Sequence, residues 1–575
     1  MNLLLDYQNK ILNLLNVLKK NATIHFSEPL KGLVVEIAPK NNNADISCNA
    51  AMVLAKHNNK APTDLAELLK KHFLINFVEF KTITVAKPGF INITFKDIFW
   101  KEYLHAVLKL SKVYGSSNKI TEKYNIEFVS ANPTGPLHVG HCRGAILGDV
   151  ISNLLKFNGH NVLKEYYVND YGNQIKSFVE SVYYRILEIN NKQEFPQDKN
   201  LYPGDYIIDI AKKIISDGKI KDFANLKSIY QNLSKESLSL SIDIIKKNLK
   251  ILGITHDNFV YESDLISKNL VEKTVDELKK SNFVYTGKLK PPKGDPTSEW
   301  KSRSQLIFKS SQFGDDVDRA LQKEDKTWTY FAGDVAYHSY KVSRNFDHLV
   351  NILGADHAGY IKRISAAVKA ISFNKINLIC KVSQLVKLYK DNKPFKMSKR
   401  EGNYITVEDL IKEVGKDSAR FMMLNRSNDV ELDFDFKKVT EQSKDNPVFY
   451  VQYAYARINS VFRNLNLSIN ESVISDLNSS EINKYEINIL KKISEWPKCV
   501  EISTNKLEPH RIPFYLYDLA ILFHSYWTLG QEDKKYRFIT ENGKPNKLRI
   551  QILKAISIVI ENGMSILGVS TPKTM

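Results

Sequence analysis

Apolar and polar positions alternate as in short strands from about residue 120 onward, and longer stretches of helical periodicity separate these strands. The alternation is clear in "YNIEFVS" and "HNVLKEYYVND", and it returns in "LVNILGADH". A further stretch, "INLICKVSQLVKLYK", predicts a fourth and a fifth strand. Strands that alternate with helices predict a doubly wound, Rossmann-like parallel sheet of the α/β class, whose ligands bind beyond the C-terminal ends of the strands.

Different patterns flank this region on both sides. Before it, an amphipathic start, "GLVVEIAPK", the helical "DLAELLKKHFL" and the alternating "FKTITVAKPGFINITF" predict a small α/β module. The stretch "YGSSNK" at 114–119 has the composition of a linker. After about residue 440, "VFYVQYAYARINSVFRNL" and "LRIQILKAISIVIENGMSILGV" keep a helical period and predict an all-helical bundle.

These changes of pattern predict the domain boundaries. We expect an N-terminal module over residues 1–118, a catalytic domain over 119–415, a connecting segment over 416–440 and a helical domain over 441–575. Residues of about 195–300 are rich in Lys and Asn and only weakly patterned, so we interpret them as an insertion between two halves of the sheet. A chain of 575 residues is too long for one core, which agrees with several domains.

Composition restricts the class of protein. Hydrophobic residues make up 43% of the chain, but no apolar run approaches the length of about 20 residues that a membrane span needs. The four cysteines are scattered, which argues against a structural zinc or a disulfide framework and favours a reducing cytoplasm. The net charge of +18 agrees with a polyanionic partner, although an AT-rich genome would also enrich Lys. The net charge alone therefore does not establish a nucleic-acid partner.

Residues 127–141, "EFVSANPTGPLHVGH", place two histidines where a strand gives way to a helix. We expect the helix to begin near His138, so that His138 and His141 lie on one side of its first turn. The N–H groups at a helix start bind phosphate, and Gly140 lets a flat base or ribose approach the backbone. The imidazoles can donate hydrogen bonds to phosphate oxygens as charge builds up. An isolated HxGH is equally compatible with histidines that only cap the helix.

A second peptide, "FKMSKREGNY" at 395–404, favours the catalytic interpretation. Its lysines, Lys396 and Lys399, flank Met397 and Ser398. Alone, such a pair is usually solvated. After the C-terminal end of a strand, it would instead stand opposite the HxGH helix, where two ammonium groups can hold the β- and γ-phosphates of ATP. HxGH followed by KMSK on a doubly wound sheet resembles a class I aminoacyl-tRNA synthetase.

The surrounding residues suggest which amino acid is bound. A guanidinium needs carboxylates placed for bidentate pairing. In "TYFAGDVAYH", Tyr330 and Asp334 are four apart on one face of a predicted helix. Glu127 lies on the strand before the HxGH turn, and Asn132 lies in the turn. Asp170 and Gln174 are interpreted as helix-capping residues and are left out of the predicted site.

Several stretches together resemble the arginyl-tRNA synthetase family, in family order over about 120–460. They are "EFVSANPTGPLHVGH", "VNDYGNQI", "FGDDVDRAL", "YFAGDVAYH", "GADHAGY", "KMSKREGN", "DFDF" and "DNPVFYVQYAYARI". The stretches "GFINITF" and "LGVS" extend the resemblance to nearly the whole chain. Some members carry a Gln near the position of Gly354, which this chain lacks.

The resemblance implies roles for individual residues. It assigns these to the amino acid: Glu127, Asn132, His138, Tyr330 and Asp334, the last two reaching the guanidinium. It assigns these to ATP: Gly140, His141, Gly354, Asp356, His357, Lys396, Ser398 and Lys399. The catalytic residues among them are His138, His141, Lys396 and Lys399. Phe90 and Asn92 match residues that contact an unpaired base of the tRNA D-loop, although a strand Phe is otherwise often buried.

The resemblance also implies the reaction. The arginine carboxylate attacks the α-phosphate of ATP, pyrophosphate leaves, and the terminal ribose of tRNA(Arg) takes the arginyl group at its 2′-hydroxyl. Mg²⁺ on the phosphates is expected to assist, but no metal-ligand spacing identifies a protein site and no tightly bound cofactor is expected. Activation is expected to need bound tRNA. We further expect a monomer in the cytoplasm without a membrane partner.

Two alternatives remain at this stage. One is another class I synthetase, for glutamate, glutamine or cysteine; the lack of a zinc-type Cys/His set disfavours cysteine, and Asp334 and Glu127 suit a cation better than an acid. The other is a synthetase-derived tRNA-binding protein without catalysis, which would be expected to have lost HxGH, KMSK or the substrate acid. A small nucleotidyltransferase with a related HxGH turn would not need 575 residues or a helical tail.

Overall fold

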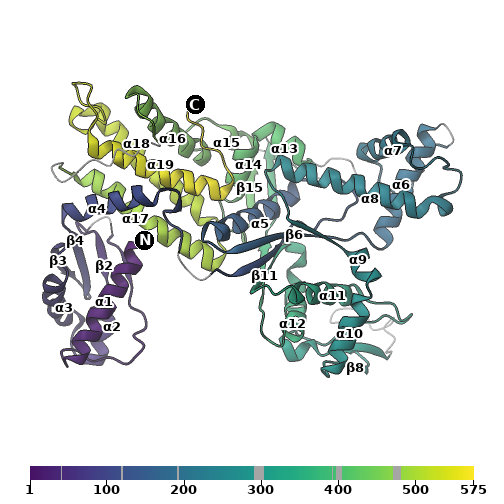
Figure 1. The fold of residues 1–575 in the computed structure, drawn as a ribbon, viewed down its shortest axis with the longest axis horizontal. Coiled ribbons are helices and arrows are strands. Elements are labelled where there is room, and N and C mark those ends of the chain that lie inside the picture. The colour runs from purple at the N-terminus through teal and green to yellow at the C-terminus, as the bar shows by residue number, and fades with distance from the viewer. Residues whose placement is uncertain are drawn as a thin grey trace. The chain divides into compact units, whose positions relative to one another are not determined.

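The computed structural model describes the chain except for residues 40–41, 118–120, 191–192, 290–303, 391–392, 396–404 and 470–480. It divides into two compact units. Unit 1 combines Met1–Lys119 with Glu441–Met575, and unit 2 is Ile120–Thr440. The ribbon in Figure 1 runs from the N-terminus in purple to the C-terminus in yellow.

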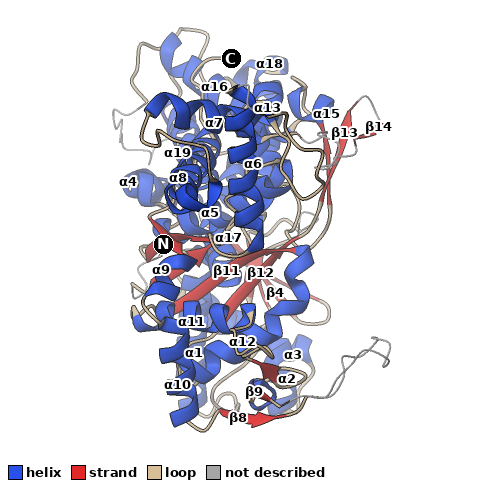
Figure 2. Cartoon of the chain, turned by 90° about the vertical axis from the view of Figure 1, so that its right-hand side faces the viewer, coloured by secondary structure: helices blue, strands red, loops and turns tan. Residues whose placement is uncertain are grey.

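Unit 2 contains a five-stranded sheet in which every pairing is parallel, with the order β12-β11-β5-β6-β7. Its strands are β5 (Lys123–Glu127), β6 (Asn161–Val168), β7 (Asn258–Tyr261), β11 (His348–Gly354) and β12 (Leu378–Ser383). Helices α5 (Val139–Phe157), α6 (Asn173–Ile189), α11 (Tyr330–Ser343) and α12 (Ile361–Ile371) connect or follow these strands. The predicted doubly wound parallel sheet is therefore confirmed, and Figure 2 shows β11 and β12 beside α11 and α12.

The order of the strands locates the crevice for ligands. The chain passes from β5 to β6 on one side, and β11 is added on the other side of β5. The strand order thus reverses between β5 and β11, and open α/β sheets bind ligands beyond the strand ends at such a point. The HxGH turn follows β5, and Gly354 ends β11. Helix α5 packs closely on this edge because Gly148 leaves room for Phe128, whose ring would lie 2.3 Å from an added Cβ.

One prediction about the strands was wrong. Strand β13 (Val386–Lys390) does not join the large sheet but forms a second sheet, β14-β13-β15, with β14 (Lys393–Phe395) and β15 (Leu432–Asp435). The fifth strand is β7, which belongs to the supposed insertion at 195–300. Alternation of side chains is the same in any sheet, and a four-residue edge strand gives almost no periodic signal.

The rest of the 195–300 region is mostly helical. Its helices are α7 (Asp205–Asp217), α8 (Leu226–Ile251), α9 (Glu262–Ser267) and α10 (Leu270–Lys280). Helices α6, α7 and α8 share one apolar core. A small antiparallel sheet of order β10-β9-β8 follows, made of β8 (Val284–Gly287), β9 (Gln305–Phe308) and β10 (Arg319–Ala320). Unit 2 ends in α13 (Val407–Val414), α14 (Lys416–Met423) and α15 (Phe436–Thr440).

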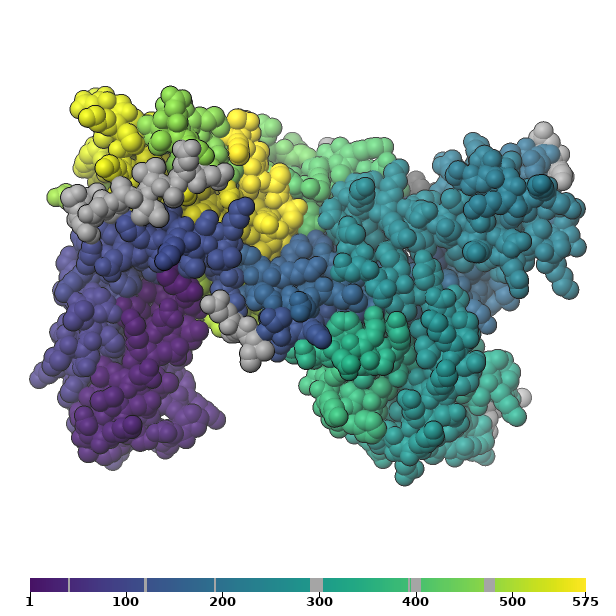
Figure 3. Space-filling model, in the orientation of Figure 1, coloured from purple at the N-terminus to yellow at the C-terminus, as the bar shows by residue number. Residues whose placement is uncertain are grey.

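Unit 1 joins an antiparallel sheet to a helical bundle. The sheet has the order β1-β2-β4-β3, with β1 (Val35–Ile37), β2 (Ile46–Cys48), β3 (Phe80–Ala86) and β4 (Phe90–Phe95). Its helices are α1 (Leu3–Lys20), α2 (Ala50–Asn58), α3 (Pro62–Asn76) and α4 (Asp97–Leu110). The bundle consists of α16 (Pro447–Asn464), α17 (Lys484–Lys506), α18 (Arg511–Glu532) and α19 (Lys547–Leu567). Helix α19 packs on α4, and in Figure 3 their surfaces are continuous.

The stretch predicted as a linker begins inside this unit. Tyr114 is fully buried, and its hydroxyl donates to the carbonyl of Ile493 at 2.8 Å. Its own carbonyl accepts from Trp496 Nε1 at 3.0 Å. The first residue of the stretch is therefore anchored in unit 1, and the division between the two units falls at its end, after Lys119.

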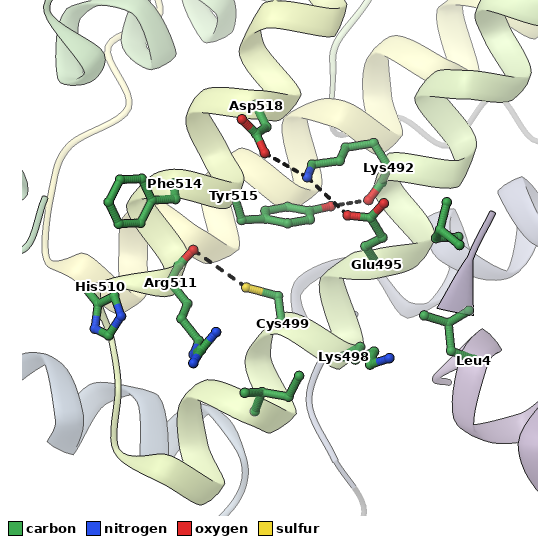
Figure 4. A pocket seen from close by; sticks show the side chains of 12 residues that line it. Leu4, Lys492, Glu495, Lys498, Cys499, His510, Arg511, Phe514, Tyr515 and Asp518 are labelled. Atoms are coloured by element: carbon green, nitrogen blue, oxygen red, sulfur yellow. Dashed lines mark hydrogen bonds and ion pairs between the residues drawn. The ribbon is translucent and has the colours of Figure 1, made fainter. Parts of the chain in front are cut away.

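Two further features of unit 1 concern its apolar parts. Among the described residues, α19 is the one helix long and apolar enough to cross a membrane by length and composition, and it is mostly buried within the protein. A cavity of about 470 Å³ lies between α17 and α18, with Leu4 and Ile37 of the N-terminal segment also at its edge (Figure 4). No residue predicted to bind substrate lines this cavity.

Candidate active site

The HxGH turn has the geometry of a helix cap. Helix α5 begins at Val139, and His138 is its N-cap residue, as predicted. His138 Nδ1 accepts from the Gly140 N–H at 3.1 Å, and His141 Nδ1 accepts from the His138 N–H at 3.2 Å. The two ring centroids are 3.9 Å apart. Because a neutral imidazole that accepts at Nδ1 carries its proton on Nε2, each ring retains one N–H donor.

Gly140 makes this arrangement possible. A Cβ at that position would lie 2.9 Å from both Cε1 and Nδ1 of His138. That approach is closer than real Cβ contacts, so any other residue would displace the imidazole. The first turn of α5 therefore combines capping with two aligned imidazoles, and the capping and phosphate-binding interpretations are compatible.

The predicted KMSK residues Lys396, Ser398 and Lys399 lie outside the described residues. The segment that follows them is described and is joined to the HxGH turn. Val139 donates its N–H to the Ile405 carbonyl at 3.0 Å, and Val407 donates to the Leu137 carbonyl at 3.0 Å. Residues 405–407 thus connect the C-terminal end of the KMSK stretch directly to the start of α5.

Two neighbouring carboxyl groups have raised pKa values. Asp334 lies on α11, and burial with the nearby Glu127 carboxylate raises its pKa to about 6 although the Tyr360 hydroxyl donates to it. Glu262, at the start of α9, has its pKa raised to about 7 by burial and by Asp334 and Asp170. Among the described residues neither Asp334 nor Glu262 forms an ion pair. Lys341 and His357 lie close enough to lower the pKa of Asp334 in part, so basic groups are near this acidic slot although neither carboxyl forms a direct ion pair with a described residue.

Glu127, Asp334, Glu262 and Asp170 surround a single aromatic ring. All four carboxyls, together with burial, raise the pKa of Tyr167. Glu127 is buried, and it accepts from Lys341 Nζ and from Ser130 Oγ. Lys341 is itself fully buried on α11 and also donates to Asn351 Oδ1 at 3.0 Å. Glu127 is thus paired with Lys341, whereas Asp334 and Glu262 form no ion pair among the described residues.

Two further predicted arginine contacts, Tyr330 and Asn132, are exposed. Tyr330 begins α11, four residues before Asp334, and is 70% exposed. Asn132 is exposed and donates to Gln174 Oε1 at 2.6 Å. Gln174 lies in the first turn of α6, so this residue, which the sequence analysis left out, supports the turn. Asp170 accepts from Ser263 and fixes the start of α9.

The predicted ATP residues on the second strand lie together at the end of β11. Gly354 is followed directly by the 3-10 helix Ala355–Tyr360, which carries Asp356 and His357. His357 Nε2 is 3.5 Å from Asp356 Oδ2, and both side chains are exposed. A Cβ at Gly354 would lie 2.5 Å from Asp356 Oδ1. These residues and the HxGH turn therefore follow adjacent strands at the same edge of the sheet.

The predicted tRNA contacts lie in unit 1. Phe90 begins β4 with 38% of its surface exposed, so the alternative of a buried strand Phe does not apply. Asn92 is buried at 2% exposure, and its Oδ1 has no hydrogen-bond partner among the described residues.

Residues that the sequence analysis missed, Glu262, Tyr360 and Lys341, lie in unit 2. A possible signal was the position of Glu262 directly after a strand, but that strand was too short to recognise.

Three family models match the chain. They are the arginyl-tRNA synthetase N-terminal domain over residues 8–95, the catalytic domain of class I tRNA synthetases (R) over 104–463, and the DALR anticodon binding domain over 451–575. Among curated relatives, an arginine--tRNA ligase of Pelagibacter ubique is 56% identical and one of Ehrlichia chaffeensis is 43% identical, covering 100% and 99% of both chains. The arginyl-tRNA synthetase of Thermus thermophilus has the same fold, with a TM-score of 0.71 at 18% identity over 99% of both chains.

The parallel sheet, with an HxGH turn after its first strand and the post-KMSK segment joined to that turn, defines a class I aminoacyl-tRNA synthetase. This class joins amino acids to tRNA with ATP. The matches over the whole length show that the chain belongs to the arginyl-tRNA synthetase family, the arginine--tRNA ligases. Its function is accordingly the charging of tRNA with arginine in translation.

Proposed function

We propose that arginine is bound and activated in the crevice between β5 and β11, with its guanidinium in the slot formed by Asp334 and Glu262. The observation that carries this assignment is a pair of half-buried carboxyls without an ion pair among the described residues, whose pKa values are raised to about 6 and about 7. A bound guanidinium would form a direct ion pair with both carboxyls, and each pKa unit restored corresponds to about 1.4 kcal/mol of binding. Tyr330 covers the guanidinium from the start of α11.

The other end of arginine is proposed to lie at the HxGH turn. Asn132 and His138 hold the amino acid there. Glu127 supports this site because it accepts hydrogen bonds from Lys341 and Ser130. In this pose the carboxylate of arginine points toward the first turn of α5. No nucleophilic side chain is required, because the substrate carboxylate attacks the α-phosphate directly and the protein positions the reactants.

ATP is proposed to bind across the two adjacent strand ends. His138 and His141 donate from Nε2 to phosphate oxygens, and Gly140 keeps the first imidazole in place. Gly354, Asp356 and His357 line the nucleotide from β11. Lys396, Ser398 and Lys399 hold the departing pyrophosphate. Mg²⁺ that accompanies ATP would neutralise phosphate charge, and we assign no side chain as its ligand.

The flanking domains are proposed to bind tRNA. Residues 1–118 contact the D-loop through Phe90, an exposed ring suited to stacking on an unpaired base, and through Asn92, whose Oδ1 has no described partner. Residues 441–575 read the anticodon, and 416–440 connect them to the catalytic domain at 119–415. We further propose that tRNA must be bound for activation. We also propose that the enzyme is a monomer, which light scattering would test, and that it is cytoplasmic without a membrane partner, which fractionation would test.

The test of this site is Lys399→Ala. We expect aminoacylation to fall by orders of magnitude while tRNA binding, measured by filter retention, stays unchanged. Lys393→Ala is the matched control, because Lys393 is an exposed lysine of β14, shortly before the KMSK stretch in the sequence. Charging of unfractionated tRNA with each amino acid tests the substrate. Unchanged charging by Lys399→Ala would refute the role of the loop, and charging with another amino acid would refute the slot.

A further inference from the structure

Two side chains of the 195–300 region contact the backbone just before the HxGH histidines. The Tyr206 hydroxyl, from α7, donates to the Thr134 carbonyl at 2.8 Å. Asn248 Oδ1, from α8, accepts from the Leu137 N–H at 3.0 Å. The two contacts enclose residues 134–137, and His138 follows directly. None of the site residues identified above comes from these two helices.

The Tyr206 contact depends on close packing. Its ring fills the space over Gly135 and Gly204, where added Cβ atoms would lie 2.9 and 2.6 Å from it. Gly135 has a φ of +157° in a turn that also holds two prolines, so the backbone there has few alternative paths. The ring also packs against the apolar core shared by α6, α7 and α8. Tyr206 is therefore anchored at both ends.

The Asn248 contact fixes the residue next to the N-cap. Leu137 is 1% exposed and Asn248 is 3% exposed, so without this side chain the Leu137 N–H would be a buried donor that lacks a partner. The Leu137 carbonyl accepts from Val407 on the other side. Leu137 is thus held by α8 through its N–H and by the post-KMSK segment through its carbonyl. The position of the His138 ring depends on both contacts.

We propose that Tyr206 and Asn248 are positioning residues for the phosphate-binding turn, so that the α7–α8 region serves catalysis and is more than an insertion. This inference rests on the proposed role of His138 and His141 in binding ATP. A misplacement of about 1 Å at a reacting group lowers rates by about 100-fold. A small loss of order at residues 134–137 is therefore expected to lower the reaction rate. Neither side chain is among the residues assigned to the arginine slot or to tRNA binding.

The kinetic test compares Tyr206→Phe and Asn248→Ala with the wild type. Tyr206→Phe keeps the ring and removes one hydrogen bond, so we expect kcat over KM for ATP to fall about three- to tenfold. Asn248→Ala leaves a buried N–H unpaired, and we expect a fall of about tenfold or more. The Kd for tRNA should stay unchanged. Asn248→Asp keeps the acceptor and should recover part of the loss.

Tyr230→Phe is the matched control, because Tyr230 lies on α8 and packs on the same apolar core but has no contact with residues 134–137. Hydrogen exchange of the Leu137 amide gives a second readout that needs no activity. We expect exchange about tenfold faster in Asn248→Ala than in the wild type and the control. Unchanged Leu137 exchange, or a loss of stability with unchanged KM for ATP, would overturn the proposal. Leu137 exchange does not depend on the substrate, so it separates this inference from failure of the proposed function.

Discussion

At the scale of single residues, the acidic slot makes arginine binding depend on pH. Asp334 and Glu262 have pKa values of about 6 and about 7, and each must be ionised to pair with a guanidinium, which stays charged throughout. We expect the KM for arginine to rise about tenfold as the pH falls from about 8 to about 6. Steady-state charging at several pH values checks this. Glu262→Gln should move the midpoint down toward that of Asp334, and a midpoint unchanged by this substitution would exclude Glu262 from the slot.

The same residues should reduce the stability of the free enzyme. A carboxyl whose pKa is raised by folding stabilises the folded state at low pH, and this contribution is lost as the pH rises through about 6 for Asp334. Asp334→Asn removes the buried charge but keeps an acceptor for the Tyr360 hydroxyl. We expect it to raise the free energy of unfolding at pH 8 by roughly 1–3 kcal/mol while abolishing charging. Urea unfolding at pH 8 and pH 5 measures this, and an equal gain at both pH values would contradict the electrostatic explanation.

At the scale of secondary structure elements, Arg143 connects α5 to the second sheet. It is 1% exposed, and its guanidinium donates to the carbonyls of Gln384, Ser427 and Val430 at 3.1, 2.8 and 2.7 Å. These carbonyls lie just before β13 and β15. The partner strand β14 leads into the KMSK stretch. One buried guanidinium therefore couples the helix of HxGH to the sheet that precedes KMSK.

Arg143→Met should remove the hydrogen bonds that connect α5 to the segments before β13 and β15. Three carbonyls lose a charged donor, so we expect the free energy of unfolding to fall by about 3 kcal/mol or more. Arg143→Lys keeps a charge but cannot reach three fixed carbonyls with one ammonium group, and we expect an intermediate loss. Urea unfolding gives the stability, and the KM for ATP reports the effect on the site. Full recovery by Lys would show that charge, and not the shape of the guanidinium, is required.

The sequence predicts the part of the site that is contiguous in the chain, but not the part that distant strands bring together. His138, Gly140 and His141 are contiguous on the first turn of one helix, so periodicity and capping rules place them. Glu262 directly follows an edge strand more than 100 residues later, and only the pairing of β7 with β6 brings it near Asp334. The separate sheet of β13 was also beyond prediction, since alternation does not say which strands pair.

At the scale of the whole molecule, unit 1 depends on a contact between its two distant segments. Trp496 on α17 donates to the Tyr114 carbonyl, and Asn562 on α19 donates to the same oxygen at 3.1 Å. Gly115 has a φ of +98°, and a Cβ there would lie 2.3 Å from Trp496. The N-terminal module and the helical bundle are therefore one folding unit, although different family models cover them.

Trp496→Phe tests this contact by removing the indole N–H. We expect amides of residues 111–116 to exchange about tenfold faster, because one hydrogen bond to a buried carbonyl is lost. Amides of β5 and α5 in unit 2 should not change and serve as the internal reference. Tyr485→Phe, at the exposed start of the same helix, is the control variant. Equal exchange at 111–116 in all three proteins would mean that the Tyr114 hydroxyl and Asn562 suffice.

The buried contact between Tyr114 and Trp496 also restricts how the proposed D-loop contact can be tested. Removing residues 1–117 would expose Trp496 and the bundle face on which Tyr114 packs, so a loss of tRNA binding by such a deletion would have two explanations. Phe90→Ala avoids this, because the ring is 38% exposed and its loss leaves the contact between Tyr114 and Trp496 intact. Stacking on one base contributes about 1–3 kcal/mol, so we expect the KM for tRNA to rise about 5- to 100-fold with kcat nearly unchanged. Val85→Ala, on the paired strand β3, is the structural control. A rise in KM of the same size in both variants would assign Phe90 to the fold and remove it from the tRNA surface.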